Sequence, residues 1–185
     1  MTEMPADDRL RYRVLNDEVL FAAEALVRLD RKTVQFLKEK ALANDRRRIR
    51  LCAHQDVQDP LHEMLIVHTR DTYVRPHKHL NKCESFHVIE GTVDVVVFDE
   101  SGSIGEVIPL GDYSSGRMFY YRLSHSYFHT LLIRSEVLVF HETTNGPFKR
   151  SDTIFASWAP EEGDEDARRK YMEQLAQAVE TFKPS

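Results

Sequence analysis

The sequence predicts a mainly β protein, built as a closed antiparallel barrel or a two-sheet sandwich, with helical segments near both ends. From Leu61 to His141, short runs of β-branched and aromatic residues alternate with turn residues, at a spacing typical of about eight strands. Residues 31–44 and the stretch after Asp164 have helical spacing instead. The length of 185 residues suits one domain.

Composition and charge limit the classes of function. With 42% hydrophobic and 30% charged residues, the chain can bury a core, which excludes disorder and fibrous repeats. The net charge of -5 argues against a nucleic-acid partner, because binding to phosphates needs clustered Lys and Arg. The one basic cluster, Arg46 to Arg50, is interpreted as a solvated helix end. No apolar run reaches the roughly 18 residues of a membrane helix.

A cytoplasmic location is expected from the N-terminal segment and from the two cysteines. The segment Met1 to Asp8 carries acids and a proline where a secretory signal has basic residues and an apolar run. Cys52 and Cys83 are two thiols far apart in the chain, which is typical of a reduced protein.

Residues 1–60 are expected to form a helix and strand extension packed on the barrel. Residues 17–29 fit either a helix or two short strands, and their periodicity does not decide between them. Residues 31–44 are predicted to be a helix with Asp30 as its N-cap. Residues 48–54 read as an extended segment.

Residues 61–145 are predicted to form the barrel. The expected strands are Met64 to Thr69, Thr72 to Val74, Ser85 to Ile89, Val93 to Phe98, Glu106 to Leu110, Phe119 to Leu123, His129 to Ile133 and Val137 to His141. Turns fall at Gly91, at Asp99 to Gly102 and around Gly111, and Gly102 suits the positive φ of a hairpin turn.

Residues 146–185 are expected to form an irregular cap and a C-terminal helix. Up to Glu162 the stretch contains Gly and Pro, and Trp158 is interpreted as a plug on a barrel face or mouth. The acids from Asp164 to Asp166 favour a helix N-terminus. The apolar face of this helix is predicted to contain Tyr171, Leu175, Ala178 and Phe182.

The most informative motif is His77-Lys-His79-Leu-Asn-Lys-Cys-Glu84, followed after six residues by Gly91. Side chains alternate along a strand, so the imidazoles of His77 and His79 project from one face. Glu84 opens the next strand and can bring a carboxylate oxygen to the same point. Imidazoles and a carboxylate on rigid strands are the donors that a divalent transition metal needs.

This spacing resembles the first motif of the cupin superfamily: His, one residue, His, three or four residues, Glu, six residues, Gly. Asp71 departs from the Gly that the family prefers six residues before the first histidine. The resemblance implies a cupin-type antiparallel β-barrel, the double-stranded jelly roll, with a metal inside it.

The second cupin motif supplies a third histidine and corresponds to residues 124–129, Ser-His-Ser-Tyr-Phe-His. Ser124 and Ser126 stand where the family usually has Pro and Gly. His129 is favoured as the third ligand, because it directly precedes a strand as the family's third histidine does, and His125 is the alternative.

A narrower resemblance is to the WbuC family of bacterial cupin-fold metalloproteins. It rests on Tyr73-Val-Arg-Pro-His-Lys-His79, on the lead into residues 50–54, and on residues 146–148 and 156–160, and it covers roughly residues 31 to 162. It implies the metal set His77, His79, Glu84 and His129. The family is associated with surface polysaccharide synthesis, and the resemblance supplies no reaction.

Other residues near the motif have competing interpretations. Arg75 either contacts the anionic group of a substrate or forms a salt bridge at the barrel mouth. Cys83 is interpreted as a buried apolar residue rather than a reactive thiol, and Tyr73 and Tyr121 as core aromatics. The histidines read as structural or solvent-facing are His54, His62, His68, His87 and His141.

Three functions are compatible with such a site. The first is a metal-dependent enzyme acting on a small sugar-derived or carboxylated metabolite, with Fe, Mn, Zn, Ni or Co as the metal. The second is a non-catalytic metal-dependent binding or sensor protein, and the third is an Fe(II) dioxygenase. A small-molecule ligand, no nucleic-acid or membrane partner, and a homodimer that covers a sheet edge are expected.

Overall fold

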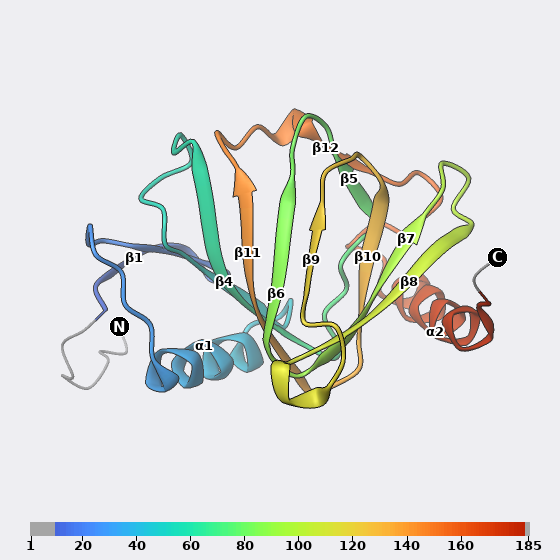
Figure 1. The fold of residues 1–185 in the computed structure, drawn as a ribbon, viewed down its shortest axis with the longest axis horizontal. Coiled ribbons are helices and arrows are strands. Elements are labelled where there is room, and N and C mark those ends of the chain that lie inside the picture. The colour runs from blue at the N-terminus through green and yellow to red at the C-terminus, as the bar shows by residue number, and fades with distance from the viewer. Residues whose placement is uncertain (1–9, 184–185) are drawn as a thin grey trace.

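Two β-sheets face each other in the computed structural model, which describes residues 10–183 (Figure 1). The segment Met1 to Asp8, used above for location, lies outside these residues. In spatial order the first sheet contains β1 (Tyr12–Asn16), β2 (Val19–Ala22), β3 (Arg48–Cys52), β4 (Leu61–Thr69), β11 (Val137–Asn145), β6 (Glu84–Glu90) and β9 (Tyr120–Leu123). The second contains β12 (Thr153–Phe155), β5 (His77–His79), β10 (Phe128–Ile133), β7 (Thr92–Phe98) and β8 (Ile104–Gly111).

The strands from β4 to β11 are interleaved as in a jelly roll. One sheet holds β4, β11, β6 and β9 side by side, the other β5, β10, β7 and β8, and all these neighbours are antiparallel. The predicted mainly β, cupin-type jelly roll is therefore the fold of this chain, and within residues 10–183 it consists of two separate sheets rather than a closed barrel. Gly91 and Gly102 turn between strands with φ of 91° each.

The predicted strand from Thr72 to Val74 is wrong. The Thr72 amide bonds the Thr69 carbonyl in a turn, and the Val74 carbonyl accepts from the Thr130 hydroxyl. Because a turn and a side chain satisfy this backbone, no strand ladder forms from Thr72 to Val74. The next strand along the chain is the short β5, which begins at His77.

The N-terminal extension adds strands to one sheet and a helix to its outer face. Residues 17–29, left undecided by periodicity, contain β2, which pairs with β1 and runs parallel to β3. Helix α1 (Arg31–Ala43) begins as predicted, with Asp30 Oδ1 accepting from the Thr33 amide at 3.0 Å. Leu37 and Ala41 of α1 are fully buried against the sheet.

The arginine cluster is a solvated helix end only in part: Arg46, Arg47 and Arg50 are exposed, as predicted, but Arg48 is half-buried. Arg46 and Arg48 pair with Glu18, at 3.1 and 2.8 Å, and both also contact Glu162. These ion pairs join the N-terminal hairpin to the C-terminal segment. Glu18 and Glu162, both distant in sequence, thus neutralise two arginines that the sequence alone leaves without partners.

The C-terminal segment is more regular than predicted. It contains a 3₁₀ turn at Arg150–Asp152 and strand β12, which pairs with β5, so the predicted irregular stretch contributes a strand to the barrel. Trp158 packs on Phe98 and Phe128, in agreement with the plug that was predicted.

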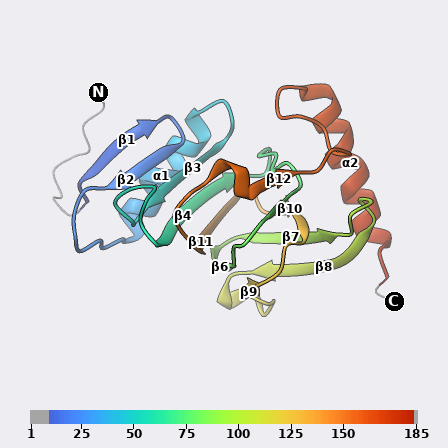
Figure 2. The ribbon, with the colours of Figure 1, turned by 90° about the horizontal axis from the view of Figure 1, so that it is seen from above.

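Helix α2 (Glu165–Thr181) packs beside the five-stranded sheet (Figure 2). It begins at the predicted acids, and Asp164 is its N-cap. Its packed face differs from the prediction, because Phe182 lies past the helix end and Ala178 is outside the cluster. The packed residues are Tyr171, Met172, Leu175, Ala176 and Val179. Neither helix within residues 10–183 has the length and apolar character that crossing a membrane requires.

The inner face of the seven-stranded sheet positions the site. One row of paired residues crosses five strands of this sheet: Cys52, Met64, Glu142, Phe86 and Tyr121. Most of this face is apolar core. The acids and arginines that interrupt it are therefore held between the sheets by strand register.

Candidate metal centre

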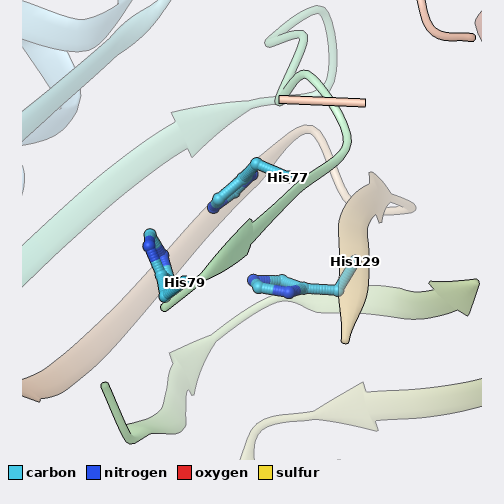
Figure 3. Close-up of side chains that lie close together, drawn as sticks. All are labelled: His77, His79 and His129. Carbon is cyan, nitrogen blue, oxygen red and sulfur yellow. The ribbon is translucent and has the colours of Figure 1, made fainter. Parts of the chain in front are cut away.

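Three histidines from two neighbouring strands point toward one another inside the barrel (Figure 3). His77 and His79 leave β5 on one face, and His129 lies directly opposite His77 across the ladder to β10. One ring nitrogen from each histidine lies within 4.8 Å of the others. Metal–nitrogen bonds of about 2.1 Å allow two donors on one ion to be at most about 4.2 Å apart, so small rotations of the rings suffice to bind a cation.

Glu84 brings a carboxylate to the same point from the opposite sheet. It is the first residue of β6 and is buried, with 7% of its surface exposed. Its Oε1 lies 3.3 Å from His129 Nε2 and its Oε2 lies 3.5 Å from His79 Nε2. The structure thus brings together the four residues that the cupin resemblance implies. His125 is left out, since it is exposed and stacks on Tyr127.

The second nitrogen of each ring is held by another group. His77 Nδ1 lies 2.8 Å from the Arg75 carbonyl, and His129 Nδ1 lies 3.0 Å from the Tyr127 carbonyl. A carbonyl only accepts, so Nδ1 carries the hydrogen in both rings and Nε2 keeps its lone pair for the cluster. His79 Nδ1 lies 3.2 Å from the Thr153 hydroxyl of β12. Such outer contacts orient imidazoles that bind metals, so the donor set fits a divalent transition metal.

Tyr121 is a site residue that sequence reasoning missed. Interpreted as a core aromatic, it instead donates a hydrogen bond from its hydroxyl to Glu84 Oε1 at 2.8 Å, while its ring stacks on Phe86. No local signal in the sequence marks this role, because the contact depends on the pairing of β6 with β9. Thr153 was missed for the same reason. Tyr73 is the core aromatic that was predicted, with its hydroxyl on the Pro160 carbonyl.

Burial and mutual charge set the protonation of the cluster. Burial, and then the nearby His129 and His79, lower the pKa of His77 to about 3, and burial also lowers the pKa of His79. Burial alone would raise the pKa of Glu84, but the adjacent histidines outweigh it and lower this pKa to about 2. Against the effect of burial, the Glu84 carboxylate raises the pKa of His129. At neutral pH the cluster therefore offers neutral imidazoles at His77 and His79 and an ionised Glu84 paired with His129, and binding of a cation would release the proton that this pair shares.

A cavity of about 450 Å³ opens beside the four donors. Its wall includes Phe86 and Phe140, stacked at 4.1 Å, and Glu142. Arg75 also lines it, and within the described part of the chain it forms no salt bridge. It donates to the Ala156 carbonyl at 3.2 Å, and its guanidinium lies 5.2 Å from the Phe155 ring. The space suits a small molecule rather than a polymer.

The remaining histidines lie outside the cluster of four donors. His87 is exposed on the outer face of β6, and His141 lies 3.9 Å from Glu63 at its closest atoms. His54, just past β3, and His62, on β4, are buried away from the cavity, whereas the buried His68 of β4 lines it. Both cysteines are free thiols, and Cys83 is half-buried.

Comparison with known proteins gives one sequence match and several structural ones. A family described as a domain of unknown function, DUF6016, matches residues 29–110. No curated protein sequence matches the chain.

Among solved structures the chain is similar to the protein SO0799 from Shewanella oneidensis, with 12% identity, 72% of this chain and 81% of that chain covered, and a TM-score of 0.47. It is similar to the capsular polysaccharide assembling protein CapF from Staphylococcus aureus, with 17% identity, 61% and 32% covered, and a TM-score of 0.49. It is also similar to oxalate decarboxylase from Bacillus subtilis, with 17% identity, 52% of this chain and 24% of that chain covered, and a TM-score of 0.40. The chain spans only a quarter to a third of these last two proteins, and the fold assignment rests on strand order and register.

Proposed function

We propose that this protein is a metal-dependent cupin enzyme acting on a small anionic metabolite, either sugar-derived or carboxylated. His77, His79, Glu84 and His129 hold one divalent transition metal: Fe, Mn, Zn, Ni or Co. The observation that carries the proposal is the convergence of three imidazoles and one buried carboxylate from three strands of two sheets, next to a cavity. A structural cluster of histidines needs neither the shared focus nor the cavity.

In this proposal some residues orient the metal ligands and another binds the substrate. Tyr121 orients Glu84, and the Thr153 hydroxyl and two backbone carbonyls orient the histidines. Arg75 lines the cavity and can hold a carboxylate or phosphate through its guanidinium. A divalent ion at the four donors supplies Lewis acidity toward a carbonyl or water at the positions they leave open.

The narrower expectations from the sequence stay part of this proposal. They are the likeness to WbuC-family proteins, the link to surface polysaccharide synthesis, the cytoplasmic location and the homodimer. The three-part division at residues 60 and 145 belongs with them. The start of β4 at Leu61 and the end of β11 at Asn145 support it, whereas β12 of the last part pairs with β5 of the middle part.

Metal analysis of three purified proteins tests the metal site. We expect about one divalent ion per chain in the wild type and less than a tenth of that in His77→Ala. His87→Ala is the matched control, because His87 is exposed on the strand that carries Glu84 and leaves the cluster intact. Equal metal content in the wild type and His77→Ala would contradict the proposal.

A metabolite screen then separates the classes of function. Turnover of a carboxylated or sugar-derived compound without oxygen uptake supports the enzyme proposed here. Oxygen consumption by the Fe(II)-loaded protein replaces it with a dioxygenase. Saturable binding without turnover of any compound replaces it with a sensor.

A further inference from the structure

The cavity wall formed by the N-terminal extension carries an arginine that forms no ion pair with any acid among residues 10–183. Arg50 lies on β3 opposite Ile66 of β4, and Ile66 belongs to the core between the sheets. The Arg50 side chain therefore projects from the inner face of the sheet. It lines the same cavity as the three histidines. Strand β3 is not one of the eight jelly-roll strands, so the N-terminal extension adds this wall to the barrel.

The arginines around the cavity differ in their partners. Arg46 and Arg48 are neutralised by Glu18 and Glu162. Arg75 bonds a backbone carbonyl. Among residues 10–183, no carboxylate lies within ion-pair distance of Arg50, Arg75 or Arg150, although all three line the cavity. Arg50 is also more than a third exposed, which leaves its guanidinium free to meet a ligand.

The acids of the cavity do not balance these charges. Glu84 is committed to the histidines. Glu142 lies on the inner face one row from Arg50. Since Glu18 and Glu162 pair with Arg46 and Arg48, Glu142 is the one further acid on the cavity wall, against Arg50, Arg75 and Arg150. The cavity therefore has a surplus of positive charge, which a bound anion would compensate.

We propose that Arg50 is an anion-binding residue of the ligand cavity, and that the ligand is a small molecule carrying an oxyanion, either a carboxylate or a phosphate monoester. A planar guanidinium can hold either group through two parallel hydrogen bonds. The inference rests on the proposed function only for the other end of the ligand, which faces the metal centre. Arg50 differs from Arg75, the arginine that the histidine motif points to, since it comes from the opposite sheet.

Calorimetric titration of inorganic phosphate and of malonate into the purified protein tests the role of Arg50. We expect the wild type to bind at least one of these anions and Arg50→Gln to bind it more than about tenfold more weakly, since the variant loses charge-assisted hydrogen bonds to the anion. Arg50→Lys should keep part of the affinity, because it keeps the charge and loses the bidentate geometry. Arg169→Gln is the control: it removes the same charge from an exposed position on α2 and should bind like the wild type.

The pattern of affinities identifies the oxyanion. Tighter binding of phosphate points to a phosphate ester, and tighter binding of malonate to a carboxylate. No binding of either anion by the wild type, or equal affinity in the wild type and Arg50→Gln, would overturn the inference. Thermal melting of Arg50→Gln checks that the variant is folded, and Arg50→Lys gives a second measurement if it is not. Metal content, measured on the same samples, reports separately on the proposed metal site.

Discussion

Two groups of histidines, one buried and one partly buried, are arranged differently in this protein. His54 and His62 stack face to face, with ring centroids 4.0 Å apart and an interplanar angle of 4°. The rings of His77, His79 and His129 are instead tilted by 51° to 72°. Stacked rings keep their nitrogens in parallel planes, whereas tilted rings can direct one nitrogen each toward a common point. Orientation, and not the number of histidines, therefore distinguishes a metal site from a packed pair.

The ring nitrogens of the cluster also have more partners than those of the stacked pair. In the cluster each histidine has one nitrogen held outside, and Glu84 contacts His79 and His129. In the stacked pair His54 Nδ1 meets the backbone of Glu63, while the buried His62 Nε2 has no hydrogen-bond partner among the described residues. Burial lowers the pKa of His54 and His62 as it does that of His77, so a neutral imidazole is common to both groups. A carboxylate at the focus belongs to the cluster alone.

The largest expected effect separates the two groups directly. His129→Ala should weaken metal binding by more than about 100-fold, because it removes a donor, and removal of outer contacts alone typically costs 10–100-fold. His54→Ala should leave the metal affinity unchanged. Competition with a chelator of known affinity measures both. Weaker metal binding in His54→Ala would show that the stacked pair supports the site.

A smaller loss of metal affinity, about tenfold, is expected when the outer contact to Glu84 is removed. Tyr121→Phe deletes the hydroxyl that bonds Glu84 and keeps the ring on Phe86. Tyr120→Phe is the matched control on the same strand, because its hydroxyl bonds Ser85 and not a donor. Equal metal affinities in the two variants would mean that Tyr121 does not orient Glu84.

The two regions should respond to pH in opposite ways: the region of the cluster should destabilise the protein as pH rises, and the stacked pair as pH falls. Glu142, near the cluster, has a folded-state pKa of about 7, raised from 4.5 mainly by burial. A carboxyl whose pKa is raised by folding destabilises the protein as pH rises from 4.5 toward 7, and fully above it. Glu142→Gln should therefore increase the free energy of unfolding at pH 8 by roughly 3 kcal/mol, and change little at pH 4. Denaturant unfolding of chelator-treated protein at the two pH values measures this, and an equal change at both would contradict it.

The smallest effect is expected at the stacked pair. Burial lowers the pKa of His62 in the folded protein, so its neutral form contributes stability that is lost as pH falls below 6.5. His62→Leu removes the titration and the unpaired nitrogen, and should make the protein about 1 kcal/mol less sensitive to acid between pH 7 and 5. Thermal melting over this range tests it. A variant as acid-sensitive as the wild type would assign the sensitivity to another group.

Local patterns in the sequence were sufficient for several features. The Asp30 cap of α1, the alternation that puts His77 and His79 on one face, and the turn at Gly102 each depend on residues a few positions apart. The outer position of His87 followed from alternation as well. Such features could be predicted because backbone geometry alone relates the residues involved.

Features that depend on distant partners could not be predicted. Thr72 to Val74 has strand-forming residues, yet the Thr130 hydroxyl occupies the Val74 carbonyl. Arg46 and Arg48 read as solvated because Glu162 lies more than a hundred residues away in the chain. A propensity describes what a segment favours by itself, and tertiary contacts override it where they satisfy the backbone or the charge in another way.

The amino-acid sequence alone determined the donor types at this centre and their grouping on two strands, because the side-chain period of a strand decides which neighbours share a face. Only the folded chain decided which third histidine joins them, which hydroxyl holds Glu84, and which arginine faces the cavity. These outcomes depend on the register between strands that are far apart in sequence, and register is set by burial of the whole inner face at once.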